Sequence, residues 1–320
     1  MTSQEKVLQL KHIIYRTLSP LIDSDYILLD LPYHSNLGDT LIWQGELDFL
    51  KTKTYKCRYS TWFGGNILNI QKKIHPETIL LFHGGGNFGD LWPEPHEFRK
   101  KVLRYYPRQK TILLPQTIYY QNRENLLEDA DFYSHYPNVT ICARDYRSFD
   151  ILKQYFPNNP SILMPDMAFA INIKHYRREK SHNGSIFIRR NDKEFNNNIN
   201  YQSIPKDSYV SDWLFLGNSK KYNRQQNIEK WGARIDKRLG TDYKHIWLDA
   251  YWYYVLRPLN VKTAIRTVDR YKSIYTTRLH AAILSIILGG KNITLFDNIY
   301  GKSSTFYKTW LSDLNDMHMV

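Results

Sequence analysis

Apolar runs alternate with segments of helical periodicity along the first half of the chain. Short runs rich in aliphatic and aromatic residues predict strands at residues 26–31, 55–61, 78–82, 111–114, 139–143 and 161–164. Apolar positions at helical spacing predict helices at residues 40–50, 94–106, 124–133 and 146–155, and an N-terminal helix at residues 5–18. Strands that alternate with helices are typical of a doubly wound parallel sheet.

The alternation starts again after a basic, polar segment at residues 174–183, which we interpret as a crossing between domains. Strands are predicted at residues 185–188, 210–216, 273–276 and 293–296, and helices at residues 227–239, around 261–268 and at 278–288, with a loop at 195–202. A chain of 320 residues is long for one hydrophobic core. The expected fold is therefore α/β, with two Rossmann-like domains, residues 1–173 and 184–320, that face a cleft. This arrangement resembles the GT-B glycosyltransferases, and the last helix is expected to pack back on the first domain.

The composition favours anionic and ring-shaped partners. The net charge is +13, and 25 Tyr with 8 Trp raise the aromatic share to 15%. Trp62, Trp92, Trp213 and residues 251–254 could stack on a sugar ring, although core packing is the commoner role of such residues. There is no run of 18 apolar residues and no signal-peptide pattern, so a cytoplasmic location is expected, with contact of the N-terminal helix with an anionic membrane as the open alternative.

Metal and disulfide chemistry are not expected. The two cysteines, Cys57 and Cys142, lie far apart in the sequence, and histidines and carboxylates do not cluster at ligand spacing. We therefore expect reduced thiols and no metal.

A glycine-rich loop follows the predicted strand at residues 78–82. Gly84, Gly86 and Gly89 have the G-x-G-x-x-G spacing of dinucleotide-binding loops, but Pro93 and Pro95 delay the helix that should begin there. The next strand also lacks the acidic residue that would hold a ribose. The loop is expected to present backbone N–H groups to a ligand and to form the first domain's wall of the cleft.

The second half of the chain carries the candidate anion site. Arg278 lies between a predicted strand and an apolar helix, and His280 lies in the first turn of that helix. Arg189 and Arg190 follow another predicted strand, and with Arg278 they are expected to form a cationic pocket.

These motifs together resemble the polysaccharide pyruvyl transferase family. The resemblance rests on six short motifs in the family's order over about residues 26–300: Asn36-Leu37-Gly38-Asp39, Gly84-Gly85-Gly86-Asn87 with Gly89-Asp90, Pro115-Gln116-Thr117, Ala143-Arg144-Asp145, Pro165-Asp166 and Arg278-Leu279-His280. The family transfers the enolpyruvyl unit of phosphoenolpyruvate to two hydroxyls of one sugar, forming a cyclic ketal and releasing phosphate. The fold of its members is similar to the two-domain glycosyltransferase type.

The resemblance also implies roles for individual residues. Arg278, Leu279, His280 and one of Arg189 and Arg190 would bind phosphoenolpyruvate, with His280 as general acid; Arg190 is favoured over Arg189 by its sequence context. Asp39 and Asp90 are candidates for the base, although N-capping or loop bracing is an equal alternative for each. The expected acceptor side comprises Asn36, Gly38, Asp39, Gly84, Gly85, Gly86, Asn87, Asp90 and Gln116.

Three functions follow from these observations. The first is a ketal pyruvyltransferase that uses phosphoenolpyruvate, needs no cofactor and acts on a polysaccharide or its lipid-linked precursor, which would favour contact with the inner face of the membrane. The second keeps the fold but uses a nucleotide sugar as a glycosyltransferase. The third, a non-catalytic binder of nucleic acid or acidic glycan, is disfavoured because the sequence shows no nucleic-acid-binding module.

Overall fold

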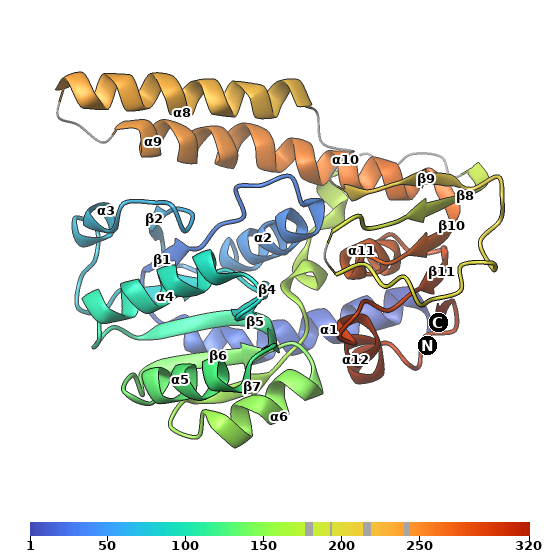
Figure 1. The fold of residues 1–320 in the computed structure, drawn as a ribbon, viewed down its shortest axis with the longest axis horizontal. Helices are drawn as coiled ribbons and strands as arrows, with labels where there is room; N and C mark the ends of the chain where they lie inside the picture. The colour runs from blue at the N-terminus through green and yellow to red at the C-terminus, as the bar shows by residue number, and fades with distance from the viewer. Residues whose placement is uncertain (177–181, 193, 214–218, 240–242) are drawn as a thin grey trace.

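The computed structural model describes residues 1–176, 182–192, 194–213, 219–239 and 243–320. Within these residues the strands form two sheets, and every strand pair is parallel (Figure 1). The first sheet has the order β2-β1-β3-β5-β6-β7, with β4 beside β5, and the second has the order β12-β11-β10-β8-β9. The predicted α/β class with parallel sheets is confirmed.

The elements of the first half follow the predicted alternation. They are α1 (Ser3–Leu18), β1 (Tyr26–Leu29), α2 (Leu37–Leu50), β2 (Cys57–Ser60), α3 (Ile67–Gln71), β3 (Ile79–Phe82), β4 (Gly85–Gly89), α4 (Pro93–Tyr105), β5 (Thr111–Tyr119), α5 (Arg123–Ser134), β6 (Val139–Ala143), α6 (Tyr146–Tyr155), β7 (Ser161–Leu163) and the 3-10 turn η2 (Met167–Ala170).

The second half contains β8 (His182–Ile188), β9 (Tyr209–Ser211), α8 (Ser219–Leu239), α9 (Tyr243–Tyr251), the π-helical segment η4 (Trp252–Leu256), α10 (Arg257–Asp269), β10 (Tyr271–Thr276), α11 (Leu279–Leu288), β11 (Asn292–Leu295), α12 (Lys302–Trp310) and β12 (Met317–Met319). The strand predicted at 210–216 is present as β9, which ends at Ser211; residues 212 and 213 are not in the strand, and residues 214–216 lie outside the described residues. Part of the predicted crossing segment, residues 177–181, lies outside them as well.

The first sheet is buried on both faces because successive side chains of a strand point to opposite sides. Leu28 and Leu81 pack into a core with α1, α2 and η2, whereas their neighbours Ile27 and Leu80 pack into a second core with α3 to α6. The continuous apolar runs that predicted these strands reflect this double burial.

The larger core continues into the second sheet. Ile186 of β8 and Ile274 of β10 belong to the same apolar cluster as Leu28 of β1, and α11 is buried along its whole length within it. Helix α1 packs on α11 as well as on η2, and its apolar residues Leu10 and Ile14 are buried. The prediction that α1 could lie on a membrane is therefore wrong for its apolar side, which packs inside the molecule.

Several elements of the second half contact the first half. Helix α10 packs on α2, and α12 packs on α6, where the indole N–H of Trp310 donates to the backbone oxygen of Arg144 over 2.8 Å. The chain termini lie side by side, because the Met1 amino group donates to the backbone oxygen of Asp313 over 2.9 Å (Figure 1). A division into domains at residues 173 and 184 stays a prediction.

Some boundaries differ from the predictions for local reasons. Helix α2 begins earlier because Asn36, and not Asp39, is its N-cap: the Asn36 side chain accepts the N–H of Gly38 over 3.0 Å. Strand β5 continues through Pro115 to Tyr119, because β4, formed by the glycine-rich segment, pairs with its second half.

Candidate active site

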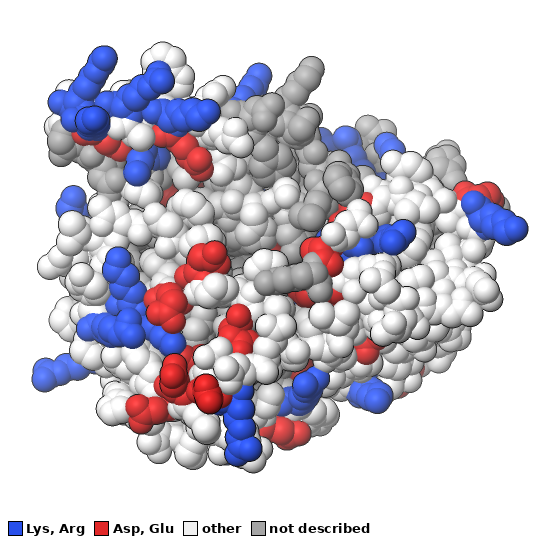
Figure 2. Space-filling view, viewed as in Figure 1, with Lys and Arg blue, Asp and Glu red and all other residues white. Residues whose placement is uncertain are grey.

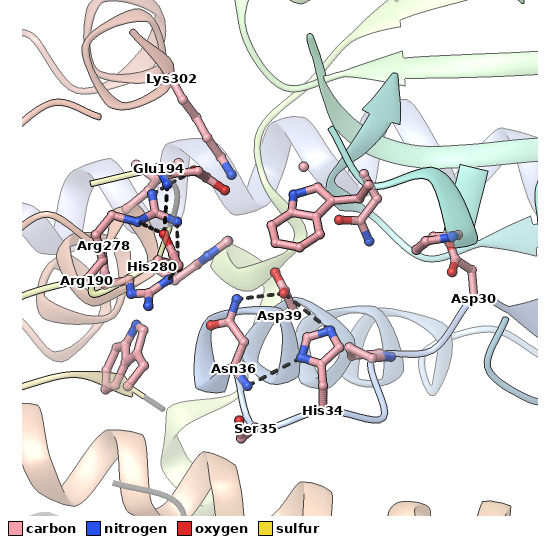
Figure 3. Close-up of a pocket in the computed structure, with 18 of the residues that line it drawn as sticks. Asp30, His34, Ser35, Asn36, Asp39, Arg190, Glu194, Arg278, His280 and Lys302 are labelled. Carbon is pink, nitrogen blue, oxygen red and sulfur yellow. Dashed lines mark hydrogen bonds and ion pairs between the residues drawn. The ribbon is translucent and has the colours of Figure 1, made fainter. Parts of the chain in front are cut away.

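A cavity of about 430 Å³ opens between the two halves of the chain. The first half contributes the loop after β1, the start of α2 and the glycine-rich segment, and the second half contributes the ends of β8, β9 and β10 and the start of α12 (Figure 3). Ligands of parallel α/β sheets bind beyond the carboxyl ends of strands, and this cavity has that position.

The two predicted arginines of the cavity are held by carboxylates. Arg278 makes a bidentate contact with Asp212, with distances of 2.9 Å from Nε to Oδ1 and 2.8 Å from Nη2 to Oδ2. Arg190 donates to Glu194 over 2.7 Å. Asp192 bridges both guanidinium groups, at 2.8 Å from Arg190 Nε and 2.8 Å from Arg278 Nη1.

These pairs change the expected electrostatics. The sequence predicted a cationic pocket around Arg278 and Arg190, but three carboxylates surround these two guanidinium groups. That prediction is wrong for this cluster taken alone. The neighbouring Arg189 does not reach the cavity: it is exposed and its guanidinium stacks on Phe195, with 4.6 Å to the ring centroid.

His280 belongs to a buried chain of polar contacts that crosses between the halves. Its Nε2 lies 3.3 Å from Oδ2 of Asp166, and the same oxygen accepts from Nη1 of Arg144 over 2.6 Å. Burial raises the pKa of the Asp166 carboxyl, but His280 and Arg144 outweigh it and hold that pKa well below the ordinary value. An ionised Asp166 holds the imidazole of His280 in one orientation at the cavity, where it can exchange a proton with a ligand.

Asp39 faces His280 from the first turn of α2. It accepts from the Asn36 amide over 2.8 Å and lies 3.6 Å from Nε2 of His34 (Figure 3). Burial raises the pKa of Asp39, but the surrounding histidines and Lys302 lower it below the ordinary value. Asp39 is therefore ionised at neutral pH and can accept a proton.

Gly38 lets α2 approach His280. A Cβ atom at Gly38 would lie 2.7 Å from the imidazole Nδ1, which is closer than real Cβ contacts. The glycine of this motif therefore serves close packing against the imidazole.

The glycine-rich segment forms one wall of the cavity through Gly86 and Asn87. Gly85 and Gly89 have φ angles of 127° and 121°, which only glycine adopts readily. The space in front of Gly86 is filled by two cations. A Cβ at Gly86 would lie 2.6 Å from Nζ of Lys302 and 3.5 Å from Nη2 of Arg144.

Two cationic donors close to this wall have no partner among the described residues. Among the described residues, the Lys302 ammonium makes neither a hydrogen bond nor an ion pair, and the buried Nη2 of Arg144 has no acceptor. Burial lowers the pKa of Lys302, Glu194 opposes this effect, and Arg144 and Arg190 add to it. Unpaired cationic donors at a cavity wall indicate a site for an anion.

The structure does not bring every predicted residue to the cavity. Asp90 braces the start of α5 by accepting from the N–H groups of Gln121 and Asn122, and Gln116 is buried, donating to the His83 backbone oxygen. Of the predicted residues, the lining contains Asn36, Asp39, Gly86, Asn87, Arg190, Arg278, Leu279 and His280, and lacks Gly38, Gly84, Gly85, Asp90, Gln116 and Arg189.

The aromatic residues divide in the same way. Trp92 and Trp213 line the cavity. Trp62 and Trp252 instead stack on Tyr33, at centroid distances of 5.9 Å and 5.0 Å. Tyr251 and Tyr253 pack against the larger core, whereas Tyr254 is exposed.

Sequence reasoning did not assign the residues that complete the site. Arg144 and Asp212 directly follow β6 and β9, and Asp166 lies three residues after the end of β7. A general signal therefore existed: a charged residue just beyond the end of a parallel strand. Lys302 had no such signal because it follows a loop after β11.

Comparison with known proteins agrees with this geometry. The family model for polysaccharide pyruvyl transferases matches residues 36–297. The chain belongs to the polysaccharide pyruvyl transferase family. The resemblance inferred from the six motifs is thereby confirmed.

Individual relatives of this pyruvyl transferase family cover most of the chain. EpsO of Bacillus subtilis, named as a pyruvyl transferase, is 32% identical and aligns with 100% of this chain and 96% of its own length. Pyruvyl transferase 1 of Schizosaccharomyces pombe is 27% identical over 89% of this chain and 69% of its own. The crystal structure of an uncharacterised Klebsiella pneumoniae protein shares the fold, with a TM-score of 0.62 at 20% identity, over 97% of this chain and 98% of that one.

Membership in this family makes the chain a transferase with a saccharide as the acceptor. In the part of the chain that the structure describes, no helix has the length and hydropathy needed to cross a membrane.

Proposed function

We propose that this pyruvyl transferase uses phosphoenolpyruvate and forms a cyclic pyruvate ketal on two hydroxyls of one sugar, releasing phosphate. The acceptor is a polysaccharide or its lipid-linked precursor. The observation that carries the proposal is the meeting of Arg278, His280 and Lys302 with Asp39 in one cavity, with the buried Arg144 behind its wall at Gly86. No metal or cofactor takes part in the proposed reaction.

The charge of the donor matches the unpaired cations. Phosphoenolpyruvate carries a carboxylate and a phosphate, about three negative charges at neutral pH. Arg190 and Arg278 are already balanced by carboxylates, whereas Lys302 and Nη2 of Arg144 are free to take the phosphate beside Gly86. Asp192 is the most exposed of the carboxylates around the arginines, and the donor carboxylate replaces it between Arg190 and Arg278.

The proposed reaction balances as one addition to C2 followed by one displacement of phosphate. His280 gives a proton to the methylene carbon of the donor, which becomes a methyl group, and C2 becomes electrophilic. The first sugar hydroxyl attacks C2 and loses its proton to Asp39. The second hydroxyl then displaces phosphate, which leaves with that hydroxyl's proton, and the ketal carbon keeps two bonds to sugar oxygens.

The architecture is part of the proposal. Two parallel sheets that point their strand ends at one cavity support a GT-B-like arrangement of residues 1–173 and 184–320. The donor lies on the side of Arg278, and the sugar lies on the side of Asn36, Asn87 and Trp92. A nucleotide-sugar glycosyltransferase is the alternative with this fold, but no observation favours it.

The test is a reaction of the protein with phosphoenolpyruvate and oligosaccharides that end in galactose. We expect acceptor-dependent release of phosphate and a glycan with one added carboxylate. Arg278→Ala and His280→Ala should abolish both, whereas Arg189→Ala, a change of the exposed neighbour of Arg190, should have little effect. Full activity of His280→Ala would contradict the general-acid role, and tight calorimetric binding of nucleotide sugars without binding of phosphoenolpyruvate would favour the alternative.

A further inference from the structure

The helix pair α8–α9 stands apart from the rest of the fold. Helix α8 packs against α9 at the outer edge of the molecule, and α9 separates it from the first sheet and α2 (Figure 1). Gly232 marks the contact line, because a Cβ there would lie 2.6 Å from Cβ of Lys244. Among the described elements, the main packing partner of α8 is α9.

The outer surface of this pair is basic. Exposed Lys and Arg side chains follow α8, and Figure 2 shows them gathered along it; they are Arg224, Lys230, Arg234, Lys237 and Arg238. Of the two acidic residues of α8, Asp236 is buried and accepts the backbone N–H of Lys244 over 2.9 Å, and Glu229 is partly exposed and accepts from the Gln225 amide of the same helix over 3.0 Å. The exposed basic side chains of α8 therefore outnumber its exposed carboxylates.

Large apolar side chains stand beside these cations. Trp231, Ile235 and Leu239 recur every four residues, so they form one stripe along α8, and Trp231 and Leu239 are 63% and 65% exposed. On α9, Trp247 is 65% exposed, on the side away from the buried Leu248. Exposure of such a stripe to water is unfavourable in free energy, and a contiguous apolar stripe of this kind is typical of an interaction surface.

We propose that the α8–α9 surface docks on a membrane that contains anionic lipids. Basic side chains contact the lipid phosphates, and the Trp and Leu side chains enter the interface between headgroups and acyl chains, as in helices that lie in the membrane plane. A helix of this kind needs both features, and each is present on α8. This inference does not depend on the proposed donor or reaction.

The position of the pair relative to the cavity suits this role. Asp249 of α9 accepts from the hydroxyl groups of Tyr33 and Thr61, over 2.8 Å and 3.1 Å, and Tyr33 adjoins the cavity residue His34. Docking through α8–α9 would hold the acceptor wall of the cavity near the bilayer, where a saccharide carried on a lipid is presented. The membrane contact that the sequence analysis left open for the N-terminal helix is thus proposed for a different element.

The test is sedimentation of the full chain with vesicles of phosphatidylcholine alone and with added phosphatidylglycerol, at low and high salt. We expect binding to the anionic vesicles, weaker at high salt. The triple variant Lys230→Glu, Arg234→Glu and Lys237→Glu should lower the partition coefficient about tenfold or more. The matched control Lys72→Glu, Lys73→Glu and Lys101→Glu makes the same change in net charge at exposed residues elsewhere, and it should have a much smaller effect.

A second pair of variants tests the apolar stripe. Trp231→Ser with Trp247→Ser should reduce binding, most clearly at high salt, where the ionic part is screened. No binding of the unchanged protein, or equal loss in the two triple variants, would overturn the proposal. Unchanged vesicle binding of the variant with both tryptophans replaced would also overturn the proposal, because it would indicate a site for any polyanion, such as nucleic acid.

Discussion

Replacing Lys302 with methionine removes the ammonium group beside Gly86 and keeps most of the side-chain volume. The structure places the ammonium in front of Gly86 and near Glu194, whose pKa is about 2 because Lys302 and Arg190 outweigh the effect of burial. Without Lys302, an ionised Glu194 faces the incoming phosphate with less compensation. A charged hydrogen bond is worth about 2–3 kcal/mol, which corresponds to roughly 30- to 150-fold in donor affinity.

The assay is the rate of phosphate release at varied concentrations of phosphoenolpyruvate. We expect the KM of the donor to rise by that factor in Lys302→Met, with a smaller change in the KM of the acceptor. Lys308→Met, an exposed lysine of the same helix, is the matched control. Gly86→Ala should act in the same direction, because its Cβ would take the place of the ammonium, and φ at Gly86 does not require glycine. An unchanged donor KM in Lys302→Met would refute the assignment of the phosphate site.

Three further predictions concern the remaining contacts of the cavity. Asp166→Asn should lower kcat roughly 10- to 100-fold with a smaller change in the donor KM, because the imidazole of His280 loses the carboxylate that orients it; an unchanged kcat would contradict this. Gly38→Ala should lower kcat on the order of 10²-fold by displacing the imidazole, with a smaller effect on the donor KM, and an unaffected kcat would show that the contact is not important. Glu194 has a pKa of about 2 in the folded chain, below its ordinary 4.5, so it stabilises the fold above about pH 4.5, and this stabilisation is lost as the pH falls towards 2. Urea unfolding at pH 5 and pH 3 should therefore show a smaller loss of unfolding free energy for Glu194→Gln than for the unchanged chain.

The strands and most helices could be predicted because local pattern decides them. Strand β6 and helix α6 have the predicted bounds, since Asp145 separates them and caps the helix by accepting the N–H of Ser148. Helix α9 was missed because its outer side is as apolar as its inner side, with Trp247 exposed and Leu248 buried. No helical periodicity marks such a sequence.

The site was less predictable because its contacts join distant elements. Arg278 and His280 were found from their place after a strand, but the partner Asp212 comes from the neighbourhood of β8 and β9, and Asp166 from the other sheet. A sequence shows that charges follow strands, and it does not show which charges neutralise each other. The prediction of a cationic pocket was therefore wrong for Arg190 and Arg278, which are paired with carboxylates. Lys302, in contrast, has no ion pair among the described residues.

We propose that the cavity between Arg278, Lys302 and Asp39 binds phosphoenolpyruvate. A crystal structure of the protein soaked with this compound shows whether it does. We predict the phosphate against Lys302 and Arg144 beside Gly86, the carboxylate between Arg190 and Arg278 in place of Asp192, and the methylene carbon facing His280. An anion bound elsewhere, or bound in this cavity with its methylene carbon turned away from His280, would contradict the account.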